Sequence, residues 1–503
     1  VEGSNFNLCS RAHTPVNIEV LGNWLQLYPH REAGVKLRWG FLEGFRLGYQ
    51  GPRCRRWADN LQSARDLPHV VFEKLTKELV KNRIAGPFKE CPLADLMISP
   101  LGVVPKKSKG EYRLIHHLSW PAGASVNDFI SEEDSAVKYA SVDDAIALVR
   151  KGGKDAEMAK SDIESAFRLL PVHPDDFSLL GMQFEGSIYV DKVLPMGCAV
   201  SCSLFELFST FLQWAFTYQS GHRLSCHYLD DFFFVGQAGS EVCGKALQNF
   251  QLLCQDLGVP LAKDKTEGPK EVLVFLGIEL DSRSMMARLP DDKVREIKDC
   301  LEFSMSQRKL ELRKVQKLLG HLNFACRVVR AGRTFLRRLG FAMSGATLPH
   351  HRIRITMAIR SDLCMWLTFL EDFNGVSMYF LDDNMLWNVQ IFSDAAGANG
   401  FGIFWDGRWC AEAWPEHWLK QGRSIAFLEF FPLLVALVVW GSEWVCKSFL
   451  FTVYNKTVVN LVNGQKAKDL RVLRLLRRFM LQCLQLNVVF KAKNIPGINN
   501  SIA

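Results

Sequence analysis

Short apolar runs bounded by turn residues predict most of the strands in the first 280 residues. These strands are expected at 101–104, at 112–115, up to about 162, in both halves of 224–236, and on either side of Gly277. Apolar positions at helical spacing predict helices at 70–79, after the Pro-x-Gly turn at 195–197, and near 241–257. The first 95 residues are predicted to be helical, and their pattern identifies no chemistry.

Residues past Pro290 are predicted to be mainly helical, because the pattern Leu-Pro-Asp-Asp-Lys-Val opens a helical region. One helix carries an apolar stripe at helical spacing, formed by Val315, Leu318, Leu319 and Leu322. A linker-like helical stretch follows at roughly 350–385.

The last third of the chain predicts a strand, a Gly-rich turn and a hairpin over 389–414, with Asp406-Gly407 as the hairpin turn. A helix over 424–440 follows, and then a strand at 449–453. Proline disrupts a helix interior, so Pro432 predicts that this helix begins just before Glu429.

Composition indicates a globular chain, with 503 residues, 48% hydrophobic and 23% charged. This length accommodates about three domains of ordinary size. The sequence has no run of eighteen uncharged apolar residues, so we expect neither a membrane span nor a signal peptide, and no membrane partner. Because the sequence begins with Val and breaks off in mid-pattern, we expect a fragment or an unusual gene model.

The fourteen cysteines are scattered and form no Cys-x-x-Cys pair. This pattern favours reduced thiols over a disulfide framework or a zinc site. We therefore expect an intracellular protein, and the sequence does not distinguish cytoplasm from nucleus.

Positive charge is concentrated in two segments, although the net charge of the whole chain is only +8. Residues 305–340 contain ten Lys or Arg against one acid, Glu311, and residues 464–493 contain eight against Asp469. Such faces indicate a polyanionic partner, most plausibly nucleic acid. The alternative is an ordinary solvated basic surface.

The acidic turn within 224–236 carries the adjacent carboxylates Asp230 and Asp231. Two such groups at a hairpin tip repel each other unless a divalent cation lies between them and a substrate phosphate. The pair therefore predicts a magnesium site. A solvated turn is the alternative, because four other Asp-Asp pairs occur, although only 230–231 lies between two apolar runs.

The hairpin formed by 101–104 and 112–115 carries three basic residues, Lys106, Lys107 and Arg113. Basic groups projecting from one hairpin suit a triphosphate. A solvated basic hairpin is the alternative.

Five motifs occur in the order found in reverse transcriptases, and the chain resembles that family. They are Asp162 with Phe167, Leu-Pro-Met-Gly at 194–197, Tyr-Leu-Asp-Asp at 228–231, the lysines before Gly268, and Phe-Leu-Gly at 275–277. The resemblance implies an α+β right-hand polymerase with fingers, palm and thumb. It further implies that Asp162 and Asp230 hold two Mg²⁺ ions, or Mn²⁺, and that Asp231 supports the site.

The resemblance also implies the residues that bind the incoming nucleotide: Lys106 or Lys107, Arg113, Phe167 and Met196. The Phe167 ring would lie under the sugar and exclude a 2′-hydroxyl, favouring deoxynucleotides; the alternative is an ordinary core phenylalanine. Lys265, or Lys263 in its place, would donate a proton to pyrophosphate. Met196 stands where many relatives have Gln, which puts its nucleotide contacts in doubt.

The basic helical segment resembles a polymerase thumb, in which Arg313, Lys314, Lys317 and Arg333 would bind the duplex backbone. Leu-Leu-Gly-His-Leu-Asn-Phe-Ala at 318–325, with Gly332-Arg333 and the basic run after it, resembles retrotransposons of the DIRS type, which use a tyrosine recombinase. The resemblance implies that a recombinase of the same element is a partner.

The order of segments from 389 onward is similar to ribonuclease H, and Asp394 and Glu429 match two of its metal-binding carboxylates. Where that family has Asp before Asn at the end of its central strand, this chain has Tyr454-Asn455. A phenol does not replace a carboxylate as a magnesium ligand at neutral pH. The closing pattern, Ile-Pro-Gly-Ile-Asn-Asn-Ser-Ile-Ala, resembles the approach to a last Asp that is not reached. We therefore expect little or no nuclease activity.

These resemblances imply a right-hand polymerase followed by an α/β ribonuclease H-like domain. The expected parts are an N-terminal helical extension (1–95), fingers and palm (96–280), thumb (281–345), connection (346–385) and a C-terminally truncated ribonuclease H-like domain (386–503). The expected activity is DNA synthesis on an RNA or DNA template from a DNA primer and deoxynucleoside triphosphates. Two alternatives stay open: hydrolysis of RNA–DNA hybrids as the working activity, and a non-catalytic nucleic-acid-binding remnant.

Overall fold

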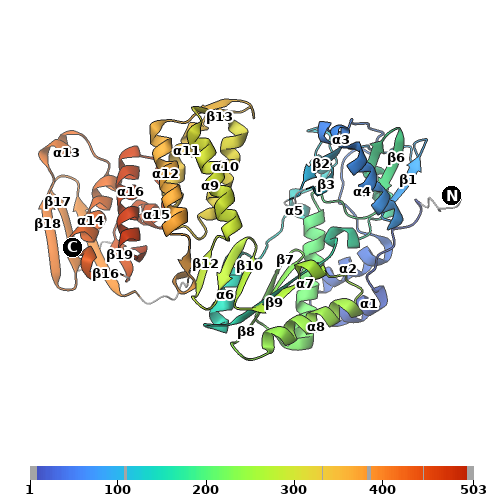
Figure 1. Ribbon diagram of the computed structural model, residues 1–503, viewed down its shortest axis with the longest axis horizontal. Helices are drawn as coiled ribbons and strands as arrows, with labels where there is room; N and C mark the ends of the chain where they lie inside the picture. The colour runs from blue at the N-terminus through green and yellow to red at the C-terminus, as the bar shows by residue number, and fades with distance from the viewer. Residues whose placement is uncertain (1–7, 107–109, 331, 382–386, 446, 496–503) are drawn as a thin grey trace. The chain divides into compact units, whose positions relative to one another are not determined.

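The computed structural model describes residues 8–106, 110–330, 332–381, 387–445 and 447–495 (Figure 1). The chain divides into two compact units, residues 1–273 and 274–503. Lys107 and the closing pattern, from the residue after Ile495 onward, lie outside the described residues.

The first unit contains a four-stranded antiparallel sheet in the order β7-β8-β4-β9, of which β7, β8 and β9 are labelled in Figure 1. Its strands are β4 (Glu157–Asp162), β7 (Ser225–Tyr228), β8 (Asp231–Gly236) and β9 (Glu267–Lys270). The helices that pack on it are α6 (Val142–Gly152), α7 (Ser201–Ser220) and α8 (Val242–Asp256). Phe232, Phe233 and Phe234 are fully buried. Burial on both faces explains why β8 is continuously apolar in sequence.

The rest of the first unit is built from short strands and helices. The strands are β1 (Ile84–Phe88), β5 (Gly181–Phe184) and β6 (Ser187–Asp191) in one sheet, and the hairpin β2 (Leu101–Pro105) and β3 (Tyr112–His116). The α-helices are α1 (Ile18–Leu27), α2 (Arg31–Glu43), α3 (Gln62–Asp66), α4 (Pro68–Val80) and α5 (Glu132–Ser135). The 3₁₀ turns are η1 (Asn127–Phe129), η2 (Ala166–Leu169), η3 (Pro174–Leu179) and η4 (Lys263–Lys265).

The second unit begins with a helical region joined to small sheets. Its strands are β10 (Val272–Phe275), β11 (Ile278–Asp281), β12 (Met286–Arg288) and β15 (Val376–Ser377), which form one sheet, and the pair β13 (Lys309–Glu311) and β14 (Arg352–Arg354). The helices and turns are α9 (Asp291–Ser306), α10 (Leu312–Ala325), η5 (Gly332–Leu336), α11 (Arg337–Ala342), α12 (Met357–Asp372) and η6 (Met378–Leu381). Because β14 and β15 pair with strands of this region, the expected linker is packed into the unit.

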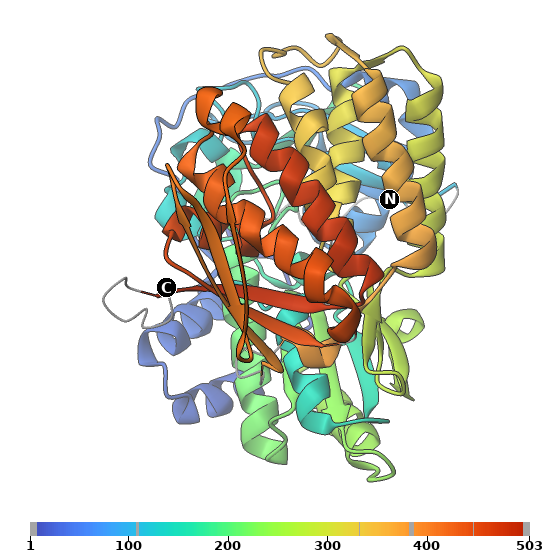
Figure 2. The same cartoon turned by 90° about the vertical axis from the view of Figure 1, so that its left-hand side faces the viewer.

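The second unit ends in a mixed five-stranded sheet, ordered β18-β17-β16-β19-β20. The strands are β16 (Val389–Ala396), β17 (Gly400–Trp405), β18 (Arg408–Ala413), β19 (Ser448–Val453) and β20 (Val489–Asn494). The helices and turn are α13 (Glu416–Lys420), α14 (Ile425–Trp440), η7 (Gly441–Glu443), α15 (Lys456–Gly464) and α16 (Leu470–Gln485). Strands β16, β19 and β20 are parallel, and α14 packs on the sheet with α16 beside it (Figure 2).

The helix α14 begins earlier than predicted, and its apolar residues pack on the five-stranded sheet. The helix begins at Ile425, so Pro432 lies in its interior and the predicted start near Glu429 is wrong. Ser424 caps this helix by accepting a hydrogen bond from the amide of Phe427 (3.3 Å), and Pro432 is itself buried. The run Ile425–Glu443 is long and apolar enough to cross a membrane, but 56% of its apolar 18-residue window is buried. Packing on β16 and β17 accounts for this apolar character.

Candidate active site

Three carboxylates converge where β4 meets the β7–β8 hairpin. Asp162 is the last residue of β4 and pairs in register with Asp231, the first residue of β8. Tyr228 pairs with Asp231 across the hairpin, so Leu229 and Asp230 form its tight turn. The turn places Leu229 in the left-handed region, at φ +53°. The hairpin predicted from the apolar runs on either side of Asp230 is confirmed.

Burial and the neighbouring charges both raise the pKa values of the two hairpin aspartates. Burial raises the pKa of Asp231 to about 7, and the charges of Asp230 and Asp162 act in the same direction. Burial and the charge of Asp162 likewise raise the pKa of Asp230. Each carboxylate therefore disfavours the ionisation of its neighbour.

Lys265, in η4, neutralises part of this charge. Its Nζ lies 3.0 Å and 2.9 Å from the two carboxylate oxygens of Asp162. Burial lowers the pKa of Lys265, but its hydrogen bond to Asp162 and the nearby negative charges outweigh burial and raise the pKa overall. Lys263 is exposed, and the structure brings Lys265 to the carboxylates.

The carboxylates supply the oxygen ligands that Mg²⁺ prefers. Among the described residues, no three His, Cys, Asp or Glu side chains are already arranged to enclose a metal ion. Chemically, however, Asp162, Asp230 and Asp231 fit a divalent cation, because a cation would offset both the burial of the Asp231 carboxylate and its repulsion by Asp230 and Asp162.

Phe167 lies in η2, five residues beyond Asp162, and its ring meets the Phe205 ring edge-on at 5.5 Å. Its neighbour Arg168 anchors this turn, because it donates to Glu78 Oε2 (2.7 Å) and Asp191 Oδ2 (2.7 Å). Burial raises the pKa of Asp191, although the charge of Arg168 opposes this effect. The anchor therefore fixes the segment that carries Phe167, and nothing local in the sequence identifies the partners of Arg168.

The residues expected to bind the triphosphate differ in their contacts. Arg113 is exposed on β3, and its positive charge acts on Asp230. Lys106 forms an ion pair with Glu111 (3.1 Å) across the hairpin. Lys107 cannot be placed, because it lies outside the described residues.

Met196 is 54% exposed in the turn before α7. Asn127 holds this turn: its side-chain amide donates to Gly197 O (2.8 Å), and its side-chain oxygen accepts from the amide of Ala199 (2.9 Å). A Cβ at Gly197 would lie 2.0 Å from His116 O, so only glycine fits this position. No local pattern in the sequence identifies Asn127, because its partners lie about seventy residues away along the chain.

Three further contacts support the hairpin, and no local pattern in the sequence identifies them. His227 Nε2 lies 3.0 Å from Glu206 Oε1 on α7, and the His227 ring stacks on Phe232. The rings of Tyr228 and Tyr139 lie 4.9 Å apart. These contacts fix β7 near its end, which holds the acidic turn in place.

The four expected backbone-binding residues of the thumb, Arg313, Lys314, Lys317 and Arg333, are all exposed. Three other basic side chains of the segment 305–340 are bonded within the second unit or partly buried in it. Arg338 bonds to Asp362 (3.2 Å), Arg337 contacts the carbonyl of Ala467 (3.4 Å), and burial lowers the pKa of Arg330. Only part of the basic segment is therefore left to meet a polyanion.

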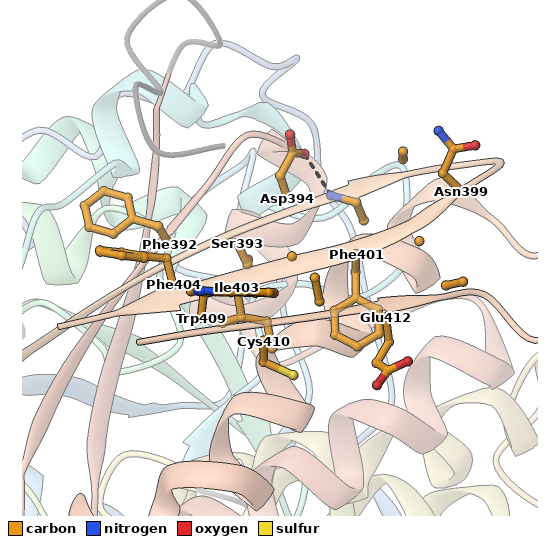
Figure 3. Close-up of a pocket in the computed structure, with 16 residues that line it drawn as sticks. Phe392, Ser393, Asp394, Asn399, Phe401, Ile403, Phe404, Trp409, Cys410 and Glu412 are labelled. Carbon is orange, nitrogen blue, oxygen red and sulfur yellow. Dashed lines mark hydrogen bonds between the residues drawn. The ribbon is translucent and has the colours of Figure 1, made fainter. Parts of the chain in front are cut away.

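The second expected site lies on the five-stranded sheet. Asp394 on β16 points away from the helices and accepts a hydrogen bond from the amide of Ala395 (2.8 Å; Figure 3). Glu429 on α14 is 8% exposed and accepts a hydrogen bond from Asn455 Nδ2 (3.3 Å). The negative charge of Asp394 acts on the Glu429 carboxylate. Burial is the largest cause of the raised pKa of Glu429. Tyr454 is 54% exposed and directly precedes Asn455, so of the carboxylates that would bind two metals this region carries Asp394 and Glu429, where three or four are needed.

An open groove of about 990 Å³ runs over β16, β17 and β18 (Figure 3). Asp394 lines it, together with aromatic side chains that include Phe392, Phe404 and Trp409. Glu429 does not line this groove.

Comparison with known proteins identifies the class of the first site. Residues 104–280 match the family model described as reverse transcriptase (RNA-dependent DNA polymerase). This range contains Asp162, Asp230, Asp231 and Lys265, and it covers about a third of the chain. The segment is therefore similar to a reverse transcriptase domain, which supports the enzyme class predicted from the sequence.

Viral polymerase proteins are similar in sequence. Protein P of duck hepatitis B virus (strain China) is 27% identical over 173 residues, covering 32% of this chain and 20% of that protein. The Gag-Pol polyprotein of walleye dermal sarcoma virus is 25% identical over 236 residues, covering 46% of this chain and 12% of that protein. The chain thus spans a fifth or less of the length of these relatives.

Solved structures of the foamy viral protease-reverse transcriptase share the fold. The protein in the complex with dsDNA is 18% identical in sequence to this chain, with a TM-score of 0.54. The match covers 96% of this chain and 99% of that chain. The complex with an RNA/DNA hybrid is 16% identical, with a TM-score of 0.52, over 100% of this chain and 66% of that chain. The α+β fold of a reverse transcriptase is therefore shown over nearly the whole chain.

Proposed function

We propose that the chain is an RNA-directed DNA polymerase that extends a DNA primer on an RNA or DNA template. One observation carries this proposal: Asp162 pairs in register with Asp231, and Asp230 lies in the turn directly before Asp231, so three carboxylates meet at the end of the hairpin. Carboxylates held this close are suited to share divalent cations on a phosphate substrate.

In this proposal Asp162 and Asp230 hold two Mg²⁺ ions, or Mn²⁺, and Asp231 supports them. Bound metal would favour loss of the proton from the primer 3′-hydroxyl and neutralise the leaving pyrophosphate. Arg113 binds the triphosphate, and Lys106 does so if it exchanges Glu111 for a phosphate. Lys265 donates a proton to pyrophosphate.

Primer extension on an oligo(dT)·poly(rA) duplex with dTTP and Mg²⁺ tests this function. The proposal predicts a ladder of extended primers that disappears when EDTA removes the metal. Intact binding of the duplex with no extension in any divalent metal would instead support the alternative of a non-catalytic nucleic-acid-binding remnant.

We propose ribonuclease H ancestry for the domain at 386–503, with little or no cleavage activity. The effect of the Asp394 charge on Glu429 supports the ancestry, and the exposed phenol of Tyr454 in place of a carboxylate supports the loss. The parent chain should leave the RNA strand of an RNA–DNA hybrid intact. Cleavage that is abolished by Asp394→Asn would show that the domain is active, and would favour hybrid hydrolysis as a working function.

We also propose that the chain comes from a DIRS-type retrotransposon, in which a recombinase of the same element is a partner. The motif at 318–325 and the arginines after it support this origin. The described cysteines are free thiols, which supports an intracellular location, either cytoplasm or nucleus. The basic residues left exposed on α10 support template and primer binding as the nucleic-acid contact.

A further inference from the structure

The strand β7, which leads into the acidic turn, lies at the edge of its sheet. Among the described residues its one strand neighbour is β8, and the helices α6 and α7 pack against it. All four residues of β7 are only partly buried. An edge strand has one row of backbone N–H and C=O groups without a strand partner, so side-chain contacts contribute more to its position than they do in a central strand.

The helix α7 holds β7 through two side-chain contacts. Gln213 Nε2 donates a hydrogen bond to Ser225 Oγ (2.6 Å) at the start of the strand. His227 Nε2 lies 3.0 Å from Glu206 Oε1 near the end of the strand, close to the acidic turn. Glu206 and Gln213 are seven residues apart, about two helical turns, and therefore share one face of α7.

Glu206 is an unusual residue at its position. It is the one charged residue in the sequence of α7, which is otherwise rich in aromatic and aliphatic residues. The side chains of Glu206 and His227 are only 13% and 11% exposed. The second carboxylate oxygen of Glu206, Oε2, is buried and has no hydrogen-bond partner among the described residues. A buried carboxylate with one oxygen unpaired costs free energy, which an apolar residue would avoid, so stability alone does not account for Glu206.

His227 connects this carboxylate to both strands of the acidic hairpin. It pairs with Phe232 across the hairpin, and the two rings stack with their centroids 5.3 Å apart. Phe232 is fully buried and directly follows Asp231. On β7, His227 directly precedes Tyr228, which pairs with Asp231 at the base of the turn. One imidazole therefore ties both ends of the turn to α7.

The acidic turn needs such support from outside. Leu229 has a φ of +53°, which is unfavourable for a residue with a bulky side chain. The charges of Asp162 and Asp230 act against the ionisation of Asp231, so the three carboxylates repel one another. Metal ligands bind well only when they are held in a defined arrangement, and loss of a side chain that orients a ligand weakens metal binding by about 10- to 100-fold.

We propose that Glu206 and His227 are positioning residues, whose hydrogen bond sets the affinity of the acidic turn for divalent metal. They act through β7 and Phe232, and neither binds the metal itself. The inference rests on the proposed polymerase function for the metal site at Asp162 and Asp230. The effect on metal binding should be present whether or not the chain extends a primer.

Mn²⁺ binding, followed by the electron paramagnetic resonance signal of free Mn²⁺, tests the proposal without catalysis. The full chain is titrated in complex with a duplex whose primer ends in a dideoxynucleotide. Glu206→Leu and His227→Phe should each raise the Kd for Mn²⁺ by about 10- to 100-fold. His227→Phe keeps a ring to stack on Phe232, and Glu206→Gln, which keeps an acceptor oxygen, should retain most of the parental affinity. Asp230→Asn identifies the site, because it should remove the tight binding of Mn²⁺.

The double variant Glu206→Met/His227→Phe separates positioning from packing. It replaces both polar partners with apolar side chains of similar size, which is close to neutral for stability. The midpoint of urea unfolding should therefore stay near the parental value, while the Kd for Mn²⁺ stays raised by about 10- to 100-fold. Because no buried charge is left unpaired, this variant decides the matter if either single variant fails to fold.

Gln213→Leu is the matched control, because it breaks the contact with Ser225 on the same strand at the end away from the turn. Its Kd for Mn²⁺ should equal that of the parent.

Parental Mn²⁺ affinity in the double variant would overturn the inference, as would an equal loss of affinity in Gln213→Leu or a parent that binds no Mn²⁺. If the parent shows the expected binding pattern but does not extend a primer with Mg²⁺, the polymerase function fails and the positioning role stands. If the parent extends a primer and the pattern is absent, the inference alone fails.

Discussion

Lys265 Nζ makes hydrogen bonds to both carboxylate oxygens of Asp162, at 3.0 Å and 2.9 Å, across more than a hundred residues of sequence. The contact brings a cation with a raised pKa to the edge of the candidate metal site. A lysine in this position has two separable roles: it can orient Asp162, or it can transfer a proton.

Substitution of Lys265 separates these roles. If Lys265 donates a proton to pyrophosphate, Lys265→Gln should lower kcat by about 10²- to 10⁴-fold, with a smaller change in KM. Lys265→Arg should not rescue kcat, because a guanidinium keeps its proton, although it preserves the charge beside Asp162. Steady-state extension kinetics decide the matter: full activity of the Arg variant would reduce Lys265 to a positioning residue.

The Phe167 ring is predicted to exclude ribonucleotides. Phe167→Ala removes the bulk that packs on Phe205, so a 2′-hydroxyl no longer meets the ring. Discrimination between dCTP and CTP, measured as the ratio of kcat/KM values, should fall by about 10- to 200-fold. Phe167→Tyr keeps the bulk and should keep the discrimination. Unchanged sugar selection in the Ala variant would return Phe167 to the role of an ordinary core residue.

Arg168 is predicted to be important for the stability of the first unit. Arg168→Met leaves the carboxylate of Asp191, which is 3% exposed, without its cationic partner. The free energy of unfolding should fall by about 3–5 kcal/mol, measured by urea denaturation. Lys77→Met breaks the exposed pair with Glu73 in α4 and should leave the free energy of unfolding nearly unchanged. Similar small losses in both variants would mean that the buried pair contributes no more than a surface pair.

The stability of the first unit should fall as the pH drops from about 6.5 to 4. Burial lowers the pKa of His116 to about 4, so the unfolded chain binds a proton in this range while folded His116 stays neutral. At pH 5 this proton costs the native state about 2 kcal/mol relative to pH 7. In urea denaturation at both pH values, His116→Gln should remove that part of the pH dependence, and the exposed His13→Gln should not. An equal loss of stability between pH 7 and pH 5 in the parent and in His116→Gln would contradict this role.

Local patterns predicted the elements and the acidic centre, because their evidence lies in neighbouring residues. The apolar runs around Asp230 specify the hairpin, and the strand ending at Asp162 specifies its partner. Asn127 and Arg168 were not predictable, because their partners are brought to them only by the tertiary fold. Charge density was an incomplete guide for the same reason: Arg338 lies in the basic segment but is paired with the buried Asp362.

The start of α14 also could not be predicted from a local rule about proline in helices. Reasoning from propensity alone treats an interior proline as a helix boundary, but the cap at Ser424 sets the actual start of this helix. The buried face of α14, including Pro432, packs within the unit, and this tertiary packing outweighs the lost backbone hydrogen bond.

The most direct test of the polymerase assignment is primer extension on an RNA template by the parent, Asp230→Asn and Asp292→Asn. Asp292 belongs to the exposed Asp-Asp pair that begins α9 and is the matched control. The account predicts Mg²⁺-dependent extension by the parent and Asp292→Asn, and a loss of several powers of ten in Asp230→Asn with duplex binding retained. Extension by Asp230→Asn at the parental rate would contradict the assignment of the acidic turn as the catalytic centre.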